Sequence, residues 1–168
     1  MKHIALTAPA LLTAEHDCSA FVCKHASLAE WLQQRALANQ HSGSSKSYVV
    51  CNDTGQVIGY YALAPGALLP SAAPGAIKRN QPSPIPVIVL GRLAVHQDWM
   101  GAGIGLGLLK DALLRSLQAS AIIGGRALLC HAIDTEAKNW YLKWGFVQSP
   151  TEAFTVMVKL DSASEPLI

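Results

Sequence analysis

Charged residues are scarce in this sequence of 168 residues. Lys and Arg number 13 and Asp and Glu number 11, so that charged residues make up 14% of the chain and the formal net charge is +2. This balance is too mild to indicate nucleic-acid binding by itself, although basic residues could still cluster locally. Hydrophobic residues make up 51%, which excludes a disordered or fibrous chain. We expect one compact domain over residues 1–160 and a polar tail over 161–168.

Long apolar runs are absent as well. No stretch reaches the roughly 18 to 20 uninterrupted apolar residues that a membrane span needs. Thr7 and Pro9 interrupt the apolar start of the chain, which is therefore expected to form a first strand and turn rather than a signal peptide. We expect a cytoplasmic protein without a membrane partner.

Paired cysteine motifs are also missing. No CxxC pair and no zinc-type histidine spacing accompanies the four cysteines, which are Cys18, Cys23, Cys51 and Cys130. We expect free thiols in a reducing compartment, with neither a disulfide nor a metal site.

The first half of the chain contains a helix pattern and a hairpin pattern. Ser27 followed by Glu30 is typical of a capping box, and the apolar spacing predicts a helix over residues 27–39. Two runs rich in β-branched and aromatic residues, 48–52 and 57–64, flank an Asp-Thr-Gly turn and predict a hairpin.

A proline-rich stretch follows the hairpin. Residues 65–86 contain six prolines, so we expect a long surface loop, which is a candidate wall of a substrate site.

The second half predicts a strand–helix–strand unit. Residues 85–95 form a nearly continuous apolar run, as expected of a central strand, and Gly91 within it predicts a bulge or a close approach to the backbone. The helix that follows leads to the next strand, so the two strands are expected to be parallel. The remaining expected elements are a strand over 126–131, a helix over 134–144 that Gly145 ends, and a strand over 155–160.

Four alternate glycines, from Gly101 to Gly107, open the helix that follows the central strand. Exposed N–H groups and the helix dipole favour an anion there, which predicts a phosphate site. A P-loop is excluded because Asp111 follows Lys110, and a dinucleotide fingerprint fits poorly because the spacing is GxGxG. A tight turn into a helix stays open as the alternative.

The same stretch resembles the pyrophosphate loop of the GNAT N-acetyltransferases. The resembling residues are Met100-Gly101-Ala102-Gly103-Ile104-Gly105, in which Met100 and Ala102 replace residues that are often basic. Asp134-x-x-Ala137-x-x-x-Tyr141-x-x-x-Gly145-Phe146 is similar to a second family segment. Further blocks resemble one branch of this family, among them Gly59–Ala64, Lys78–Asn80 and Leu90–Val95. On all these segments, the chain is similar to the TacT-like group, the toxins of type II toxin–antitoxin systems that acetylate aminoacyl-tRNA.

This resemblance implies an α/β (α+β) fold of the GNAT type, with a mixed, mostly antiparallel sheet flanked by helices. It implies transfer of acetyl from acetyl-CoA to the α-amino group of aminoacyl-tRNA, which blocks translation. The implied partners are a ribbon–helix–helix antitoxin, operator DNA bound only through the antitoxin complex, and a second copy in a homodimer.

The resemblance also implies site residues. Tyr141 is the expected proton donor for the departing thiolate, because its phenol is protonated at neutral pH. The expected coenzyme-binding residues are Leu93, Ala94, Val95, Met100, Gly101, Ala102, Gly103, Ile104, Gly105 and Asn139. The expected tRNA-binding residues are Lys46, Lys78, Arg79 and Arg92, with an internal salt bridge as the alternative for Arg92.

Several alternatives stay open from the residues alone. His96, Asp98 and His131 are candidate bases, although a histidine at a strand end is more commonly structural. Solvated surface charge is expected at Glu30, Asp53 and Asp111. The alternative functions are acetylation of small amines or proteins, and a regulatory module that binds CoA without catalysis.

Overall fold

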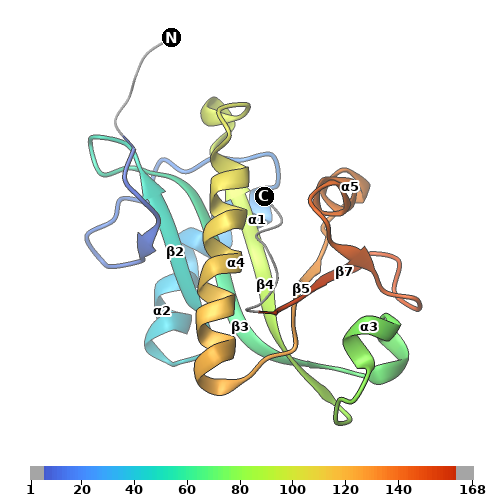
Figure 1. Cartoon of the computed structure of the whole chain (residues 1–168). Helices are drawn as coiled ribbons and strands as arrows, with labels where there is room; N and C mark the ends of the chain where they lie inside the picture. Colours follow the sequence, from blue (N-terminus) through green and yellow to red (C-terminus); the bar gives the residue numbers. More distant parts are fainter. Residues whose placement is uncertain (1–5, 162–168) are drawn as a thin grey trace. The chain divides into compact units, whose positions relative to one another are not determined.

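The computed structural model describes residues 6–161, so the first five residues of the expected N-terminal strand lie outside the described residues. The chain divides into two compact units. Among the described residues, the first comprises 6–64 together with 91–112, and the second comprises 65–90 together with 113–161 (Figure 1).

Within residues 6–161, seven strands form one sheet whose neighbours are mostly antiparallel. The β4–β5 pair is parallel, as the predicted strand–helix–strand unit requires, with Ile88 opposite Leu128. The mixed, mostly antiparallel sheet expected from the sequence is confirmed. The strand order is β1 (Ala10–Leu11), β2 (Lys46–Cys51), β3 (Val57–Leu68), β4 (Ile85–Val95), β5 (Ala127–His131), β7 (Thr155–Lys159) and β6 (Val147–Gln148).

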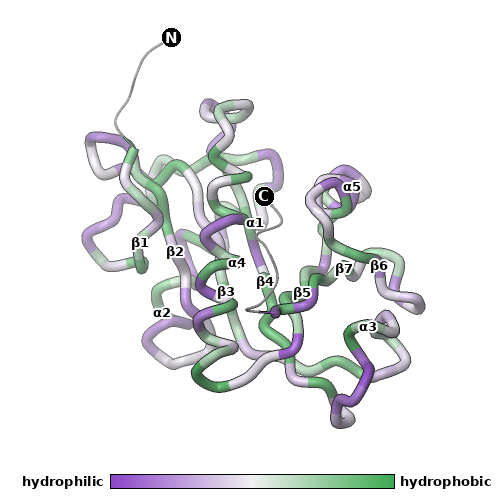
Figure 2. Tube along the Cα trace, viewed as in Figure 1, coloured by the Kyte–Doolittle hydropathy of each residue, from purple (hydrophilic) through white to green (hydrophobic). Residues whose placement is uncertain are grey.

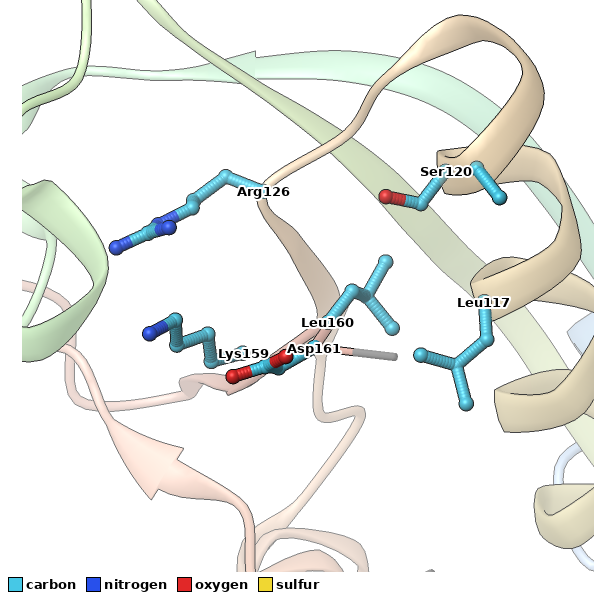
Figure 3. Close-up of a pocket in the computed structure, with 7 residues that line it drawn as sticks. Leu117, Ser120, Arg126, Lys159, Leu160 and Asp161 are labelled. Carbon is cyan, nitrogen blue, oxygen red and sulfur yellow. The ribbon is translucent and has the colours of Figure 1, made fainter. Parts of the chain in front are cut away.

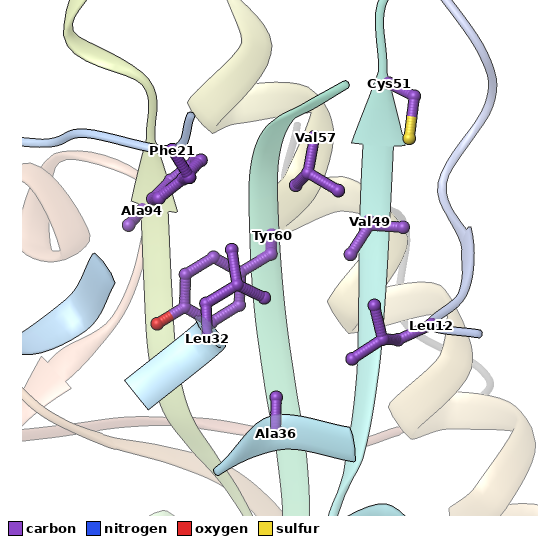
Figure 4. Packing of buried hydrophobic residues seen from close by; sticks show 9 residues of the cluster. All are labelled: Leu12, Phe21, Leu32, Ala36, Val49, Cys51, Val57, Tyr60 and Ala94. Atoms are coloured by element: carbon purple, nitrogen blue, oxygen red, sulfur yellow. The ribbon is translucent and has the colours of Figure 1, made fainter. Parts of the chain in front are cut away.

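In the first unit, two helices pack on the β2–β3 hairpin, which is present as predicted. Their bounds are α1 (Ala26–Gln34) and α2 (Ala36–His41). Figure 4 shows the apolar cluster between these helices and the strands, with Tyr60 and Val49 wholly buried. Burying such large side chains is the main stabilising contribution to this unit.

The expected single helix with a Ser27 cap is wrong on two counts. The N-cap position is occupied by His25, two residues before the expected cap, and its side chain makes no cap hydrogen bond, so that Ser27 lies inside the first turn. The helix also breaks at Arg35. Separate side-chain hydrogen bonds fix the two helices, from Gln33 to the carbonyl of Phe21 and from Gln40 to the carbonyl of Leu12, and periodicity does not encode such contacts.

In the second unit, the expected loop over 65–86 is also largely wrong. The strand β3 continues to Leu68, and η1 (Pro70–Ala72) and α3 (Gly75–Lys78) follow before β4 begins. The stretch is ordered because its apolar side chains are buried in one cluster with the sheet residues Leu129 and Met157. The buried members from this stretch are Leu68, Ala73, Ile77 and Ile85.

The remaining helices agree with the sequence. They are α4 (Ile104–Ile123) and α5 (Thr135–Lys143), and Gly145 closes the latter with a φ of +96°. The short strand β6 is not predicted by the sequence, because two exposed residues carry no pattern. No helix among residues 6–161 is both long enough and apolar enough to cross a membrane.

Candidate active site

The glycine-rich loop joins β4 to α4 in the first unit. Gly101 and Gly103 adopt φ values of +81° and +79°, a left-handed conformation that favours glycine. No atom lies within 4 Å of a Cβ built at either position. The backbone is thus open to solvent, and the first N–H groups of α4 have no partner within the helix. This geometry fits an anion held by backbone donors.

The start of α4 is held against β3 by a close approach at Gly59. A Cβ at this position would lie 3.1 Å from side-chain carbons of both Ile104 and Leu108. A larger residue would therefore push the first turn of the helix away from the strand. The glycine fixes where the N–H groups of that turn lie.

The candidate base His96 has a structural role. Its Nδ1 accepts a hydrogen bond from the N–H of Asp98 at 3.0 Å and caps η2 (Gln97–Trp99), so that the proton resides on Nε2. Nε2 then donates to the carbonyl of Ala20 at 3.1 Å. Both ring nitrogens are occupied, and the imidazole holds the turn before the glycine loop.

The end of β4 presents alternating environments. Ala94 is buried, whereas Leu93 and Val95 are half-buried. β4 continues through Gly91, where a bulge stays a prediction. No atom lies within 4 Å of a Cβ built at Gly91, so no neighbour in the described part of the chain requires a glycine at this position.

Arg92 stacks on an aromatic side chain. Its guanidinium carbon lies 4.3 Å from the ring centroid of Trp31, within the range of a cation–π interaction. Trp31 stacks in turn on Tyr60, whose hydroxyl donates to the carbonyl of Leu28. Burial raises the pKa of Tyr60 well above 10, and the positive charge of Arg92 partly opposes this.

Tyr141 lies on α5 in the second unit and is 5% exposed. Its ring packs against Trp140 and Phe146, with centroids 5.1 and 5.3 Å away. Its phenol O–H donates to Sγ of Cys130 on β5. Burial raises the pKa of Tyr141 well above its usual 10 and that of Cys130 to about 11. Both groups therefore keep their protons at neutral pH.

The other predicted site residues are exposed or engaged in structural contacts. Lys46 is exposed at the start of β2 in the first unit, whereas Lys78 and Arg79, at the end of α3, and Asn139, on α5, are exposed in the second. His131 bonds through Nδ1 to the hydroxyl of Thr155 at 2.9 Å.

Asp111 corrects an expectation, because it is not a solvated surface charge. It is half-buried and accepts a hydrogen bond from the hydroxyl of Tyr61, which is fully buried. The four cysteines are free thiols. No group of metal-binding side chains occurs within residues 6–161.

Sequence reasoning missed two contacts. Cys130 carries no motif that links it to Tyr141, and Trp31 none that links it to Arg92. Both pairs join segments far apart in the chain, so only the folded structure reveals them.

Residues 44–148 match the acetyltransferase (GNAT) domain family. This chain belongs to the GNAT family. A tRNA-acetylating toxin from Mycobacterium tuberculosis is 42% identical to this GNAT protein over 157 residues, covering 94% of each chain. The solved structure of AtaT complexed with acetyl-methionyl-tRNAfMet aligns with a TM-score of 0.85 at 26% identity, covering 92% of this chain and 95% of that one. The solved structure of AtaTR bound with AcCoA aligns with a TM-score of 0.78 at 26% identity, covering 92% of this chain and 93% of that one.

These comparisons confirm the family, the GNAT fold and the acetyltransferase class expected from the sequence, and acetyl-CoA is the co-substrate of the GNAT family. The residues from Met100 to Gly105 fit its pyrophosphate through open backbone N–H groups at the start of α4. Met100 is 64% exposed and carries no charge, so its side chain offers no cation to an anion at this loop.

Proposed function

We propose that this chain transfers the acetyl group of acetyl-CoA to the α-amino group of aminoacyl-tRNA and thereby blocks translation. The observation that carries the proposal is the similarity, over almost the whole chain, to a tRNA-acetylating toxin. The chemistry is supported by Tyr141, whose pKa is raised by burial so that its hydroxyl is protonated at neutral pH.

The proposal assigns a role to each predicted site residue. Acetyl-CoA supplies a thioester whose carbonyl carbon the substrate amine attacks, so that a C–N bond forms and the C–S bond breaks. N–H groups of residues 101–105 bind the pyrophosphate, and the backbone of 93–95 aligns the pantetheine arm. Tyr141 donates its proton to the departing sulfur and is reprotonated by solvent. Asn139 completes the coenzyme site from α5.

No strong base is needed for the proposed reaction. The α-amino group of an aminoacyl ester has a pKa below the roughly 7.7 of a free chain terminus, so much of it is neutral at physiological pH. The amine proton leaves to solvent. This agrees with the structural role of His96, whose two nitrogens are both occupied.

Basic side chains provide the tRNA contacts in this proposal. Lys46 and Arg92 contribute from the first unit, and Lys78 and Arg79 from the second. Phosphate contacts of this kind position a nucleic acid without reading its sequence, and they weaken as the salt concentration rises.

The proposal includes the partners implied by the toxin resemblance. These are a ribbon–helix–helix antitoxin, operator DNA that is bound through the antitoxin complex, and a second copy of the chain in a homodimer. Because charged tRNA is a cytoplasmic substrate, the proposal also includes a cytoplasmic location.

A competition between acceptors tests the function. The purified protein is incubated with radiolabelled acetyl-CoA and equal concentrations of charged tRNA, deacylated tRNA, free amino acids and a lysine-containing peptide. The label is expected on charged tRNA alone. Label on the free amines or the peptide would favour a different GNAT substrate, and no transfer at all would favour a binding module.

A further inference from the structure

The helix α3 is too short to be stable by itself. It comprises four residues, Gly75–Lys78, and its N-cap residue Pro74 provides no side-chain hydrogen bond. Isolated helices in water are marginal below about 12 residues. Contacts with the rest of the second unit must therefore hold it, and it carries the exposed cations Lys78 and Arg79 at its end.

Arg126 makes the most specific of these contacts. This residue directly precedes β5, and its own N–H donates to the carbonyl of Pro86 at 2.8 Å. Its side chain donates from Nε to the carbonyl of Ile77 and from Nη2 to that of Ala76, both at 3.0 Å. A planar guanidinium suits two adjacent acceptors, and a cation is favoured at the carbonyl end of a helix.

The direction of this side chain is visible in the pocket beside β5 and α4. Figure 3 shows Arg126 extending away from Leu117 and Ser120 of α4, on the same side as Lys159. Lys159 is exposed, and it is the second cation that lines the pocket. Arg126 donates two hydrogen bonds to α3. Of the two cations that line this pocket, one is therefore bound to the helix and the other is exposed.

Two further contacts fix the same segment. Ile77 is 4% exposed and packs in the apolar cluster of this unit. Ser149, which is 2% exposed, donates from its hydroxyl to the carbonyl of Ala72 at 2.6 Å. Figure 2 shows the chain changing from hydrophobic to hydrophilic at the end of α3. The buried side of the segment is thus anchored, and its charged end faces solvent.

We propose that Arg126 is a positioning residue that holds α3 so that Lys78 and Arg79 are presented to the phosphates of the tRNA substrate. This inference rests on the proposed function. Arg126 itself does not touch the substrate. Without it, the short helix samples open conformations and must be ordered when tRNA binds, which weakens binding and leaves the chemical step unchanged.

Arg126→Gln tests the inference, and Lys159→Gln is its matched control. The control removes one positive charge from the same pocket but keeps the contact between Arg126 and α3. We expect Arg126→Gln to raise the KM for charged tRNA about tenfold, since it removes hydrogen bonds from a charged group. Its kcat and its KM for acetyl-CoA stay as in the wild type. Lys159→Gln changes the KM for tRNA less than twofold, and Arg126→Lys, which keeps the charge and one donor, gives an intermediate value. Equal effects of the two glutamine variants would overturn the inference.

A double-mutant cycle separates positioning from direct contact. In a background of Lys78→Gln and Arg79→Gln, adding Arg126→Gln is expected to change the KM for tRNA no further, because the cations that it positions are gone. The same tenfold loss in both backgrounds would show that Arg126 acts independently of them, and would overturn the inference.

Hydrogen exchange provides a readout that does not depend on the substrate. The N–H groups of Lys78 and Arg79 donate to the carbonyls of Pro74 and Gly75. Their exchange should accelerate at least tenfold in Arg126→Gln and stay unchanged in Lys159→Gln. Unchanged exchange would overturn the anchoring role, whereas failure to acetylate any charged tRNA would overturn the proposed function and leave this measurement interpretable.

Discussion

Among the tyrosines, the hydrogen-bond acceptor distinguishes the candidate acid from the structural residues. The hydroxyl of Tyr60 is bound to a backbone carbonyl and that of Tyr61 to the carboxylate of Asp111. The hydroxyl of Tyr141 is bound to the sulfur of Cys130. Sulfur is a weak acceptor, so the hydroxyl of Tyr141 gives up a weaker hydrogen bond than the other two when it turns to a new acceptor.

Replacing Tyr141 by Phe tests this assignment. The variant keeps the ring packed against Trp140 and Phe146 and removes only the donor. We expect kcat to fall about 100-fold or more, as for loss of a general acid, while the KM for acetyl-CoA stays within twofold. Steady-state kinetics with charged tRNA measure both constants.

The matched control for that variant is Tyr60→Phe, which deletes a buried hydroxyl outside the proposed site. It should lower the free energy of unfolding by about 1 kcal/mol and leave kcat unchanged. If both variants lose kcat equally, or if Tyr141→Phe retains full activity, Tyr141 is not the proton donor.

The glycine loop is tested by a pair of substitutions to alanine. Gly103 has a φ of +79°, so Ala there introduces strain of about 1–3 kcal/mol or rotates the N–H groups. Gly107 lies within α4 with open space around it, so Ala should stabilise the protein by about 0.5–1 kcal/mol. Isothermal titration should show acetyl-CoA binding about tenfold weaker for Gly103→Ala and unchanged for Gly107→Ala. Equal affinities would exclude the loop as the pyrophosphate site.

At the scale of elements, the N-cap of α5 supports the helix that carries Tyr141, the proposed proton donor. The carboxylate of Asp134 accepts a hydrogen bond from the N–H of Ala137 at 2.8 Å. Asp134→Ala should destabilise the first turn by about 1 kcal/mol and accelerate hydrogen exchange along α5. A several-fold loss of kcat should follow, because Tyr141 lies on this helix.

Asp134→Asn is the control for this helix, since Asn caps as well as Asp does. Its exchange rates along α5 and its kcat should equal those of the wild type. A loss of kcat in the Asn variant would instead assign a charge-dependent role to Asp134.

Elements with a strong local pattern could be predicted from the sequence. The apolar run of β4 gave its bounds, Ile85–Val95, and the hairpin and α4 were similarly clear. The sequence did not reveal α3, because four residues carry no periodicity and burial of Ile77 together with the Arg126 contacts makes them helical. The break at Arg35 also depends on tertiary hydrogen bonds.

The residues of the candidate site also fall into two groups, those that a sequence motif marks and those that only the folded structure reveals. Tyr141 and the glycines belong to family motifs and could be identified from the sequence. Cys130, Trp31 and Arg126 act through contacts between distant segments, and no local signal marks them.

At the scale of the whole molecule, buried protonated thiols make stability depend on pH. Burial raises the pKa of Cys130 from about 9 to about 11. Below pH 9 both the folded and the unfolded protein hold this proton. Between pH 9 and 11 the unfolded protein releases it first, so the free energy of unfolding falls by at most roughly 1.4 kcal/mol per pH unit from this group.

Urea denaturation from pH 8 to pH 11 measures this dependence. The variant Cys130→Ala should show a shallower decrease with pH than the wild type, whatever its stability at pH 8. Parallel curves would mean that Cys130 titrates normally in the folded protein.

The central claim is that the acetyl group reaches the α-amino group of an amino acid esterified to tRNA. Mass spectrometry of the products after nuclease digestion of charged tRNA tests it most directly. The account predicts N-acetyl-aminoacyl-adenosine with the wild type and at least 100-fold less with Tyr141→Phe. Unmodified aminoacyl-adenosine with the wild type, while acetyl-CoA is consumed on another amine, would contradict it.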